Sequence, residues 1–264
     1  MILGHTLKNN VSFKMAGQSL LPYIRRVMIG MKLNNLFKSK IFGYITICAG
    51  IIGIGAQLVL ILTFKDYLYG EGSSNPLELS GWNYLSFFTQ ITNIATAVWL
   101  LFFGVCRIAG AEAALRKITH PLLHGGITLS IFVVGFIYWG VLFWFIDLYP
   151  WNLWFGNLVD FWNHAFIPLS MTLFWIFYRD ERKVDTKKIY LWLIYPIVYF
   201  VFSMVRGYFV NWYPYPFLDP NDEMLAGFGV NSYIIIAAAV VVLTGVFYGF
   251  GRLTMWIRNR RIKE

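Results

Sequence analysis

Strongly polar side chains recur at helical spacing inside several long apolar runs of this chain. In the run that begins near residue 82, they follow one another at intervals of three or four: Asn83, Ser86, Thr89, Gln90 and Asn93. Residues three or four apart share one face of a helix, so these hydroxyls and amides are predicted to point in one direction. A hydroxyl on such a stripe is a candidate nucleophile where a base lies within reach.

A candidate base lies in a later apolar run. Asp160 and His164 are four residues apart, so on a helix the carboxylate can reach the imidazole on the same side. Asn163 is the alternative group that could orient the ring. In the next run, Tyr199 and Arg206 lie on one face, and Arg206 is a candidate anchor for a carboxylate or phosphate. These residue types could supply a nucleophile, a base, an orienting group and an anion anchor.

Two further histidines, His120 and His124, are also four residues apart. Their helix is expected to begin at the membrane surface opposite to that of His164, roughly 20 Å away along the membrane normal. No third ligand is evident near either of them. We therefore interpret both as interfacial residues and predict neither a metal site nor a cofactor.

The composition indicates which solvent surrounds the elements that carry these residues. Apolar residues make up 58% of the 264 positions and charged residues only 13%, against roughly a quarter in a typical soluble domain. A soluble core of this size could not bury so much apolar surface, so the bilayer must be the solvent. The net charge of +9 falls in blocks between the apolar runs, which is typical of membrane topology and not of nucleic-acid binding.

The apolar runs predict an all-α fold of six transmembrane helices. Each run is long enough to cross about 30 Å of hydrocarbon. The predicted spans are residues 42–64, 82–105, 121–145, 158–178, 189–210 and 228–250. The fourth span is the least regular, because Asp160, Asn163 and His164 interrupt its outer end.

The basic residues predict the orientation of these spans. With six spans and a cytoplasmic N-terminus, 20 of the 22 Lys and Arg residues fall on the cytoplasmic side. They lie in the N-terminal segment 1–41, in the loops near 107–120 and 179–188, and in the C-terminal tail 251–264. Within the first segment, residues 19–37 could form a helix along the membrane surface. We expect a multi-pass protein of the plasma membrane with both termini in the cytoplasm.

The rise per residue places the polar residues at one level of the outer leaflet. On upright helices, Ser86 and Arg206 lie about 6 Å below the outer surface, His164 about 9 Å and Thr89 about 10 Å. Polar groups in a bilayer are costly, and they often mark functional sites. The alternative is that they are hydrogen-bonding contacts between packed helices.

Three separated segments resemble one known family and keep its order. They are Trp82 to Phe87 (WNYLSF), Trp162 to His164 with Pro168 downstream, and Trp212 to Asp219 (WYPYPFLD). These are similar to segments of the androgen-induced, FAR-seventeen-like membrane hydrolases. The bacterial branch, the "Pr six Pr" six-span membrane proteins, matches better. It shares the following residues with this chain: Phe88 and Thr89 with Asn93, His164 with Pro168, and Tyr195 and Pro196 with Arg206 and Gly207.

The resemblance implies a membrane-embedded hydrolase of fatty-acid esters that uses a Thr nucleophile and a His. By position, His164 takes the role of the His, and Ser86 stands where the hydrolases have Thr. Thr89, one turn deeper on the same face, is the other candidate and lies closer to His164 in depth. Membrane lipids or lipid-like esters are then the expected partners. The alternative is a non-catalytic membrane protein that binds lipid, transports or acts as a scaffold, with the polar residues serving helix packing.

Overall fold

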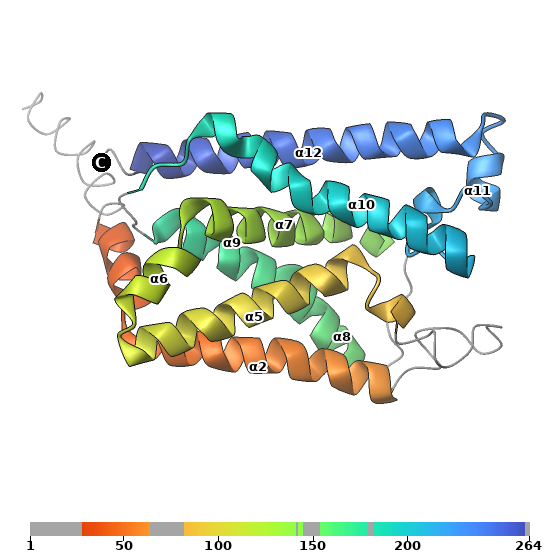
Figure 1. Ribbon diagram of the computed structural model, residues 1–264. Helices are drawn as coiled ribbons and strands as arrows, with labels where there is room; N and C mark the ends of the chain where they lie inside the picture. The colour runs from red at the N-terminus through yellow and green to blue at the C-terminus, as the bar shows by residue number, and fades with distance from the viewer. Residues whose placement is uncertain (1–27, 64–81, 141, 145–153, 179–181, 262–264) are drawn as a thin grey trace, which may run out of the picture.

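The computed structural model describes residues 28–63, 82–140, 142–144, 154–178 and 182–261 (Figure 1). Throughout these ranges the regular elements are helices, and no strand occurs. The long helices lie side by side, with α6 and the C-terminal end of α12 at one end of the bundle and α11 at the other (Figure 1). The all-α prediction is confirmed.

Among the described residues, five helices are long and apolar enough to cross a membrane, which indicates a membrane protein. The helices are α2 (Lys40–Thr63), α5 (Phe88–Ala109), α7 (Pro121–Gly140), α10 (Tyr190–Val210) and α12 (Ser232–Arg261). Large apolar side chains are exposed on their outer faces; Val241 of α12 and Tyr208 of α10, for example, are 71% and 78% exposed. Surface of this kind is stable against lipid and not against water.

The fourth predicted span, 158–178, is helical but not uniform. It consists of α8 (Trp154–Phe161), a π-helical turn (Trp162–Phe166) and α9 (Ile167–Phe177). Because each part is short, this segment is not among the five long helices.

Short elements connect the long helices. They are α6 (Glu112–Ile118), α11 (Glu223–Ala226), and 3₁₀ turns at Leu142–Trp144, Thr186–Ile189 and Pro216–Leu218. Of the predicted surface helix 19–37, residues 28–37 are described and are helical, and Phe37 is buried against Phe42 and Phe174. The remaining part of the segment 1–41 lies outside the described residues, apart from 38–41.

Helix α7 occupies the middle of the bundle, between the α2–α5 pair and the α10–α12 pair (Figure 1). It contacts α5, α9, α10 and α12. Aromatic and aliphatic side chains such as Phe103, Ile131 and Phe174 form the core where α5, α7 and α9 meet. The polar residues of α7 and of the helices around it are therefore held in a closely packed environment.

Two of the predicted boundaries differ from the structure by more than five residues. Helix α5 begins at Phe88 and not at 82, because the chain turns at Leu85–Phe87 after a short helical segment at 82–84. Helix α12 continues past the predicted end at 250 to Arg261. Its last turns are packed: Met255 is fully buried, and the Arg258 guanidinium lies 4.0 Å from the centre of the Trp175 ring. Part of the predicted tail 251–264 is thus helix.

The interfacial interpretation of His124 is wrong. Its side chain is fully buried, and its ring stacks on that of Trp99 with centroids 4.6 Å apart. Phe174 and Trp175 of α9 also contact the ring. The His124 side chain is buried because α5 and α9 extend past the start of α7 and surround its first turn with aromatic side chains. His120, one turn earlier, is exposed as predicted.

Candidate active site

His164 lies in the π-helical turn between α8 and α9. A proline four residues later, Pro168, has no N–H to donate to the His164 carbonyl, so the regular helical bond cannot form. The indole Nε1 of Trp139, on α7, donates to this carbonyl instead, at 3.0 Å. Gly135 allows the approach, because a Cβ at this position would lie only 2.8 Å from the same oxygen. Single π turns of this kind frequently occur at functional sites.

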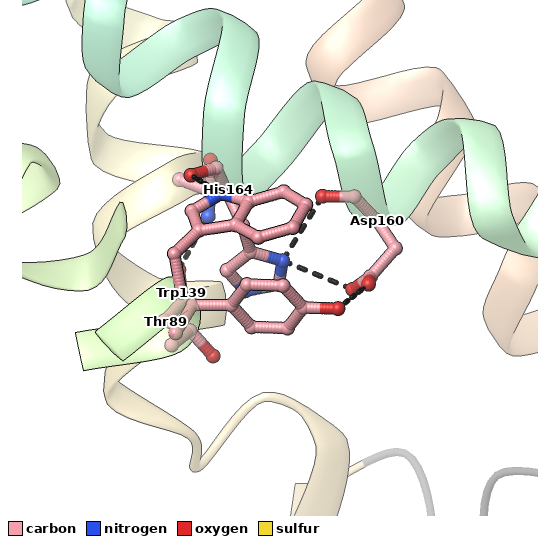
Figure 2. Close-up of polar contacts among 6 residues, drawn as sticks. Thr89, Trp139, Asp160 and His164 are labelled. Carbon is pink, nitrogen blue, oxygen red and sulfur yellow. Dashed lines mark hydrogen bonds and ion pairs between the residues drawn. The ribbon is translucent and has the colours of Figure 1, made fainter. Parts of the chain in front are cut away.

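The imidazole of His164 is held from several directions. Its Nδ1 lies 2.9 Å from Asp160 Oδ1 and 3.0 Å from the Asp160 main-chain oxygen. The Tyr138 hydroxyl donates to Asp160 Oδ2. The Tyr138 ring also stacks on the imidazole, with centroids 3.9 Å apart and planes 8° from parallel. Figure 2 shows this arrangement, with Asp160 on one side of the ring and Thr89 on the side away from it in this view.

This geometry determines which nitrogen of His164 can act as a base. Two acceptors at Nδ1 favour the tautomer in which Nδ1 carries the proton. The lone pair is then on Nε2, and no hydrogen bond involves Nε2 in the part of the chain that the structure describes. The carboxylate of Asp160 would also stabilise the imidazolium formed when Nε2 takes a proton. His164 is buried, at 6% exposed, so such a proton would come from a bound group.

Thr89 lines an apolar cavity of about 420 Å³. The walls come from α5, α7, α10, α12 and the 3₁₀ turn Pro216–Leu218. Three lining side chains, Phe136, Ile197 and Val242, are also exposed on the outside of the bundle, at 47%, 47% and 65%. The cavity therefore borders the lipid-facing surface.

The polar groups of the cavity are few. The Thr89 side chain forms a hydrogen bond with the phenol of Tyr215, which follows α10 and also lines the cavity. Burial raises the pKa of the Tyr215 phenol to about 12, against the lowering effect of its hydrogen bonds with Thr89. The phenol therefore stays protonated at neutral pH and remains a hydrogen-bond donor beside the Thr89 hydroxyl.

The Ser86 hydroxyl is engaged with its own backbone. It donates to the Trp82 carbonyl at 2.5 Å. The Ser86 carbonyl accepts from the Tyr199 hydroxyl at 2.8 Å, and the same hydroxyl accepts from the Phe88 N–H at 3.1 Å. Tyr199, from α10, thus satisfies both backbone groups that the turn before α5 leaves open. Ser86 and Tyr199 form a structural junction between two helices.

Arg206 belongs to the same junction. Its Nη2 donates to Asn83 Oδ1 at 2.6 Å, and its guanidinium lies 5.3 Å from the centre of the Trp212 ring. Its Nη1 is buried and has no hydrogen-bond partner among the described residues. Arg206 therefore links α10 to the turn before α5 and keeps one donor for another group.

The two remaining candidates are buried. Asn93 donates from Nδ2 to the Thr89 carbonyl at 2.9 Å, a bond within α5. Asn163 is 3% exposed and lies in the π turn beside His164. Asp160, and not Asn163, contacts the imidazole.

The predicted site residues fall into two groups of contacts. Asp160 and His164 are held by α7, whereas Ser86, Tyr199 and Arg206 join the start of α5 to α10. Thr89 lies on the inner face of α5 and lines the cavity together with Tyr199. His164 is not among the residues that line this cavity. Over the described ranges, no hydrogen bond joins His164 to either hydroxyl.

Sequence analysis missed Tyr138 and Trp139, which orient the pair. A depth estimate could have found them. Tyr138 lies 17 residues beyond Pro121, about 26 Å from the N-terminal end of α7 and so near the level expected for His164. Applying the estimate to aromatic residues with a polar tip, and not only to charged ones, would have included both.

No family model, no curated protein and no solved structure matches this chain. The resemblance to the membrane hydrolases stays a prediction. The described residues also contain no group of three or more His, Cys, Asp or Glu side chains that could hold a metal ion.

Proposed function

We propose that this chain crosses the plasma membrane six times, with both termini in the cytoplasm. The crossing added to the five long helices is the fourth in chain order, the segment Trp154 to Phe177. At 1.5 Å per residue it is about 36 Å long, which is sufficient for the hydrocarbon core. The distribution of Lys and Arg supports the orientation, because 20 of 22 then lie on the cytoplasmic side.

Reporter fusions test this topology. Reporters placed after Gly81 and after Asp219 are expected outside the cell, and those after Ala111, Asp185 and Arg261 inside. The physical reason is that segments rich in Lys and Arg are retained in the cytoplasm. Two enzymatic reporters are used at each position, one active only in the cytoplasm and one active only outside, so that every location gives a positive signal from one of them. A cytoplasmic signal after Asp219 contradicts the model.

We further propose that the protein is a membrane-embedded hydrolase of fatty-acid or lipid esters. The observation that carries this proposal is the His164–Asp160 pair: a carboxylate at Nδ1, a stacked Tyr138 ring, and Nε2 left as the basic nitrogen. A histidine that merely packs between helices does not require a carboxylate partner at Nδ1. A carboxylate that holds Nδ1 is what a general base requires.

In the proposed reaction, Thr89 is the nucleophile. Its hydroxyl oxygen attacks the carbonyl carbon of the ester, and His164 Nε2 takes the hydroxyl proton and passes it to the departing alcohol. The cavity beside Thr89 is apolar and of a size for an aliphatic chain. Arg206 Nη1, which has no hydrogen-bond partner among the described residues, can anchor an acidic group of a bound substrate.

One set of contacts favours the alternative, a non-catalytic membrane protein. The hydroxyls of Ser86 and Thr96 and the amide of Asn93 all bond to carbonyls of their own helical segments. These bonds are typical of packing residues in transmembrane helices. A covalent probe separates the two functions, because a fluorophosphonate labels an activated hydroxyl and not a packing residue.

Separate replacements identify the nucleophile. Thr89→Ala is expected to abolish fluorophosphonate labelling and hydrolysis of a long-chain ester in liposomes, because it removes the attacking oxygen. Ser86→Ala is the matched control: it removes a hydroxyl already bonded to Trp82 and should retain most of the activity. Loss of turnover in Ser86→Ala with Thr89→Ala intact reverses the assignment. Full activity in both variants excludes a hydroxyl nucleophile at this site.

A further inference from the structure

Helix α2 buries one narrow stripe of residues against α5. The buried positions are Gly43, Thr46, Gly50, Gly53 and Gln57. The first four are small and allow the two backbones to approach closely. Gln57 is the exception, a long polar side chain that is 2% exposed at the end of a stripe of small residues.

The register of α2 against α5 places Gln57 opposite Gln90. A Cβ at Gly43 would lie 3.1 Å from the Gly104 carbonyl, and a Cβ at Gly50 would lie 2.7 Å from the Ala97 carbonyl. The helices are antiparallel, so seven residues forward on α2 correspond to seven residues back on α5. A further step of seven pairs Gln57 with Gln90.

Four polar atoms on three side chains at this junction have no hydrogen-bond partner among the described residues. They are both amide atoms of Gln57, Oε1 of Gln90, and Nε1 of Trp162. Trp162 is close, because a Cβ at Gly53, one turn before Gln57, would lie 3.9 Å from its Nε1. Since both amide atoms of Gln57 are unpartnered, exchanging its oxygen and nitrogen does not change this result.

We propose that Gln57, Gln90 and Trp162 form a binding site for water inside the bundle. Buried polar groups in native proteins are almost always hydrogen-bonded to protein or to ordered water. The three side chains are uncharged and offer both donors and acceptors, which matches a water molecule and neither an ion nor an apolar ligand. Where two polar groups face each other beyond direct bonding distance, water is the usual bridge.

The site lies next to the proposed catalytic residues. Gln90 follows Thr89 directly on α5, and Trp162 lies in the same π turn as His164. We assign this water the role of second substrate, an assignment that rests on the proposed hydrolase function. Its oxygen attacks the carbonyl carbon of the acyl-Thr89 ester while His164 Nε2 takes one of its protons. The bond to Thr89 Oγ1 then breaks, Oγ1 recovers that proton, and a fatty acid leaves.

Replacing Gln57 with Met tests the water site by the sign of a stability change. Met has nearly the length of Gln but no polar atoms. If water satisfies the amide, Gln57→Met lowers the melting temperature in detergent, by about 2–4 °C for each hydrogen-bond equivalent lost. A rise in melting temperature overturns the proposal, because removing an unsatisfied buried amide stabilises a protein.

Thr128→Val is the matched control. Its hydroxyl is also buried without a partner among the described residues, but one hydroxyl does not supply the two to four polar partners that a buried water needs. Its melting temperature is expected to stay the same or to rise. A fall equal to that of Gln57→Met shows that the measurement reports loss of any polar atom, and overturns the assignment.

The role in hydrolysis is tested with a long-chain nitrophenyl ester under pre-steady-state conditions. The first turnover releases nitrophenol by acylation, and later turnovers wait for water. Gln57→Met is expected to keep the burst amplitude and to slow the steady state by at least about tenfold. An unchanged steady state overturns the role as second substrate. If the wild-type protein shows neither a burst nor turnover, the proposed hydrolase function is wrong. The melting temperatures of Gln57→Met and Thr128→Val then still test the water site.

Discussion

Replacing His164 with Gln is expected to lower ester hydrolysis by about 10²–10⁴-fold, the usual contribution of a general base. Gln preserves hydrogen bonding and volume but cannot take a proton. The measurement is kcat/KM for a long-chain ester in liposomes, together with the rate of fluorophosphonate labelling. Both should fall in parallel, because the same base activates the hydroxyl in each reaction.

Two further variants serve as a control and as a test of the partner carboxylate. His120→Gln removes an exposed imidazole four residues from the buried His124, far from the site, and should leave both rates unchanged. Asp160→Asn keeps the shape of the partner but removes the charge that stabilises the imidazolium, so hydrolysis should fall while the protein remains folded. If His164→Gln retains full activity, His164 is a packing residue and the proposed hydrolase is wrong.

Replacing Gly104 with Leu is expected to prevent α2 from docking on α5 and to abolish the folded protein. Even a Cβ at Gly104 would lie 2.5 Å from the Gly43 carbonyl and 2.7 Å from Thr46 Oγ1. Overpacking of side chains costs about 1–3 kcal/mol, and here the obstacle is backbone, which cannot rotate away. The measurement is the yield of monodisperse protein in detergent and its melting temperature.

Gly249→Leu is the matched control for this helix contact. Gly249 also lies in a long helix, but no heavy atom lies within 4 Å of a Cβ at that position. The substitution should be neutral or slightly stabilising, because Leu favours helix more than Gly does. Equal losses of yield and melting temperature in both variants would mean that the loss does not come from the contact of α2 with α5 at Gly104.

The long helices were predictable because each depends on a property of consecutive residues. An apolar run of sufficient length must cover its backbone polar groups by forming a helix, wherever it lies in the bundle. The same local logic predicted that Asp160 could reach His164, since a spacing of four brings the two side chains to one face. The structure places them in contact.

The irregular features were not predictable because each depends on a distant partner. The turn before α5 is stable only because Tyr199, more than a hundred residues later, bonds both Ser86 and Phe88. The π turn at His164 likewise depends on Trp139 for its carbonyl and on Gly135 for space. Pro168 marks the break in the helix locally, but no pattern within residues 82–88 or 158–168 identifies these distant partners.

The position of the cavity against the lipid-facing surface has a consequence for how its occupancy is measured. Side chains such as Ile197 and Val242 belong to both the cavity wall and the outside of the bundle. An amphiphile dissolved in the bilayer meets these walls by diffusing in two dimensions. Its occupancy then follows its mole fraction among the surrounding lipids and not its amount per volume of buffer. Adding inert lipid at constant total ligand therefore dilutes the ligand at the site, although the bulk concentrations of ligand and protein in the tube stay the same.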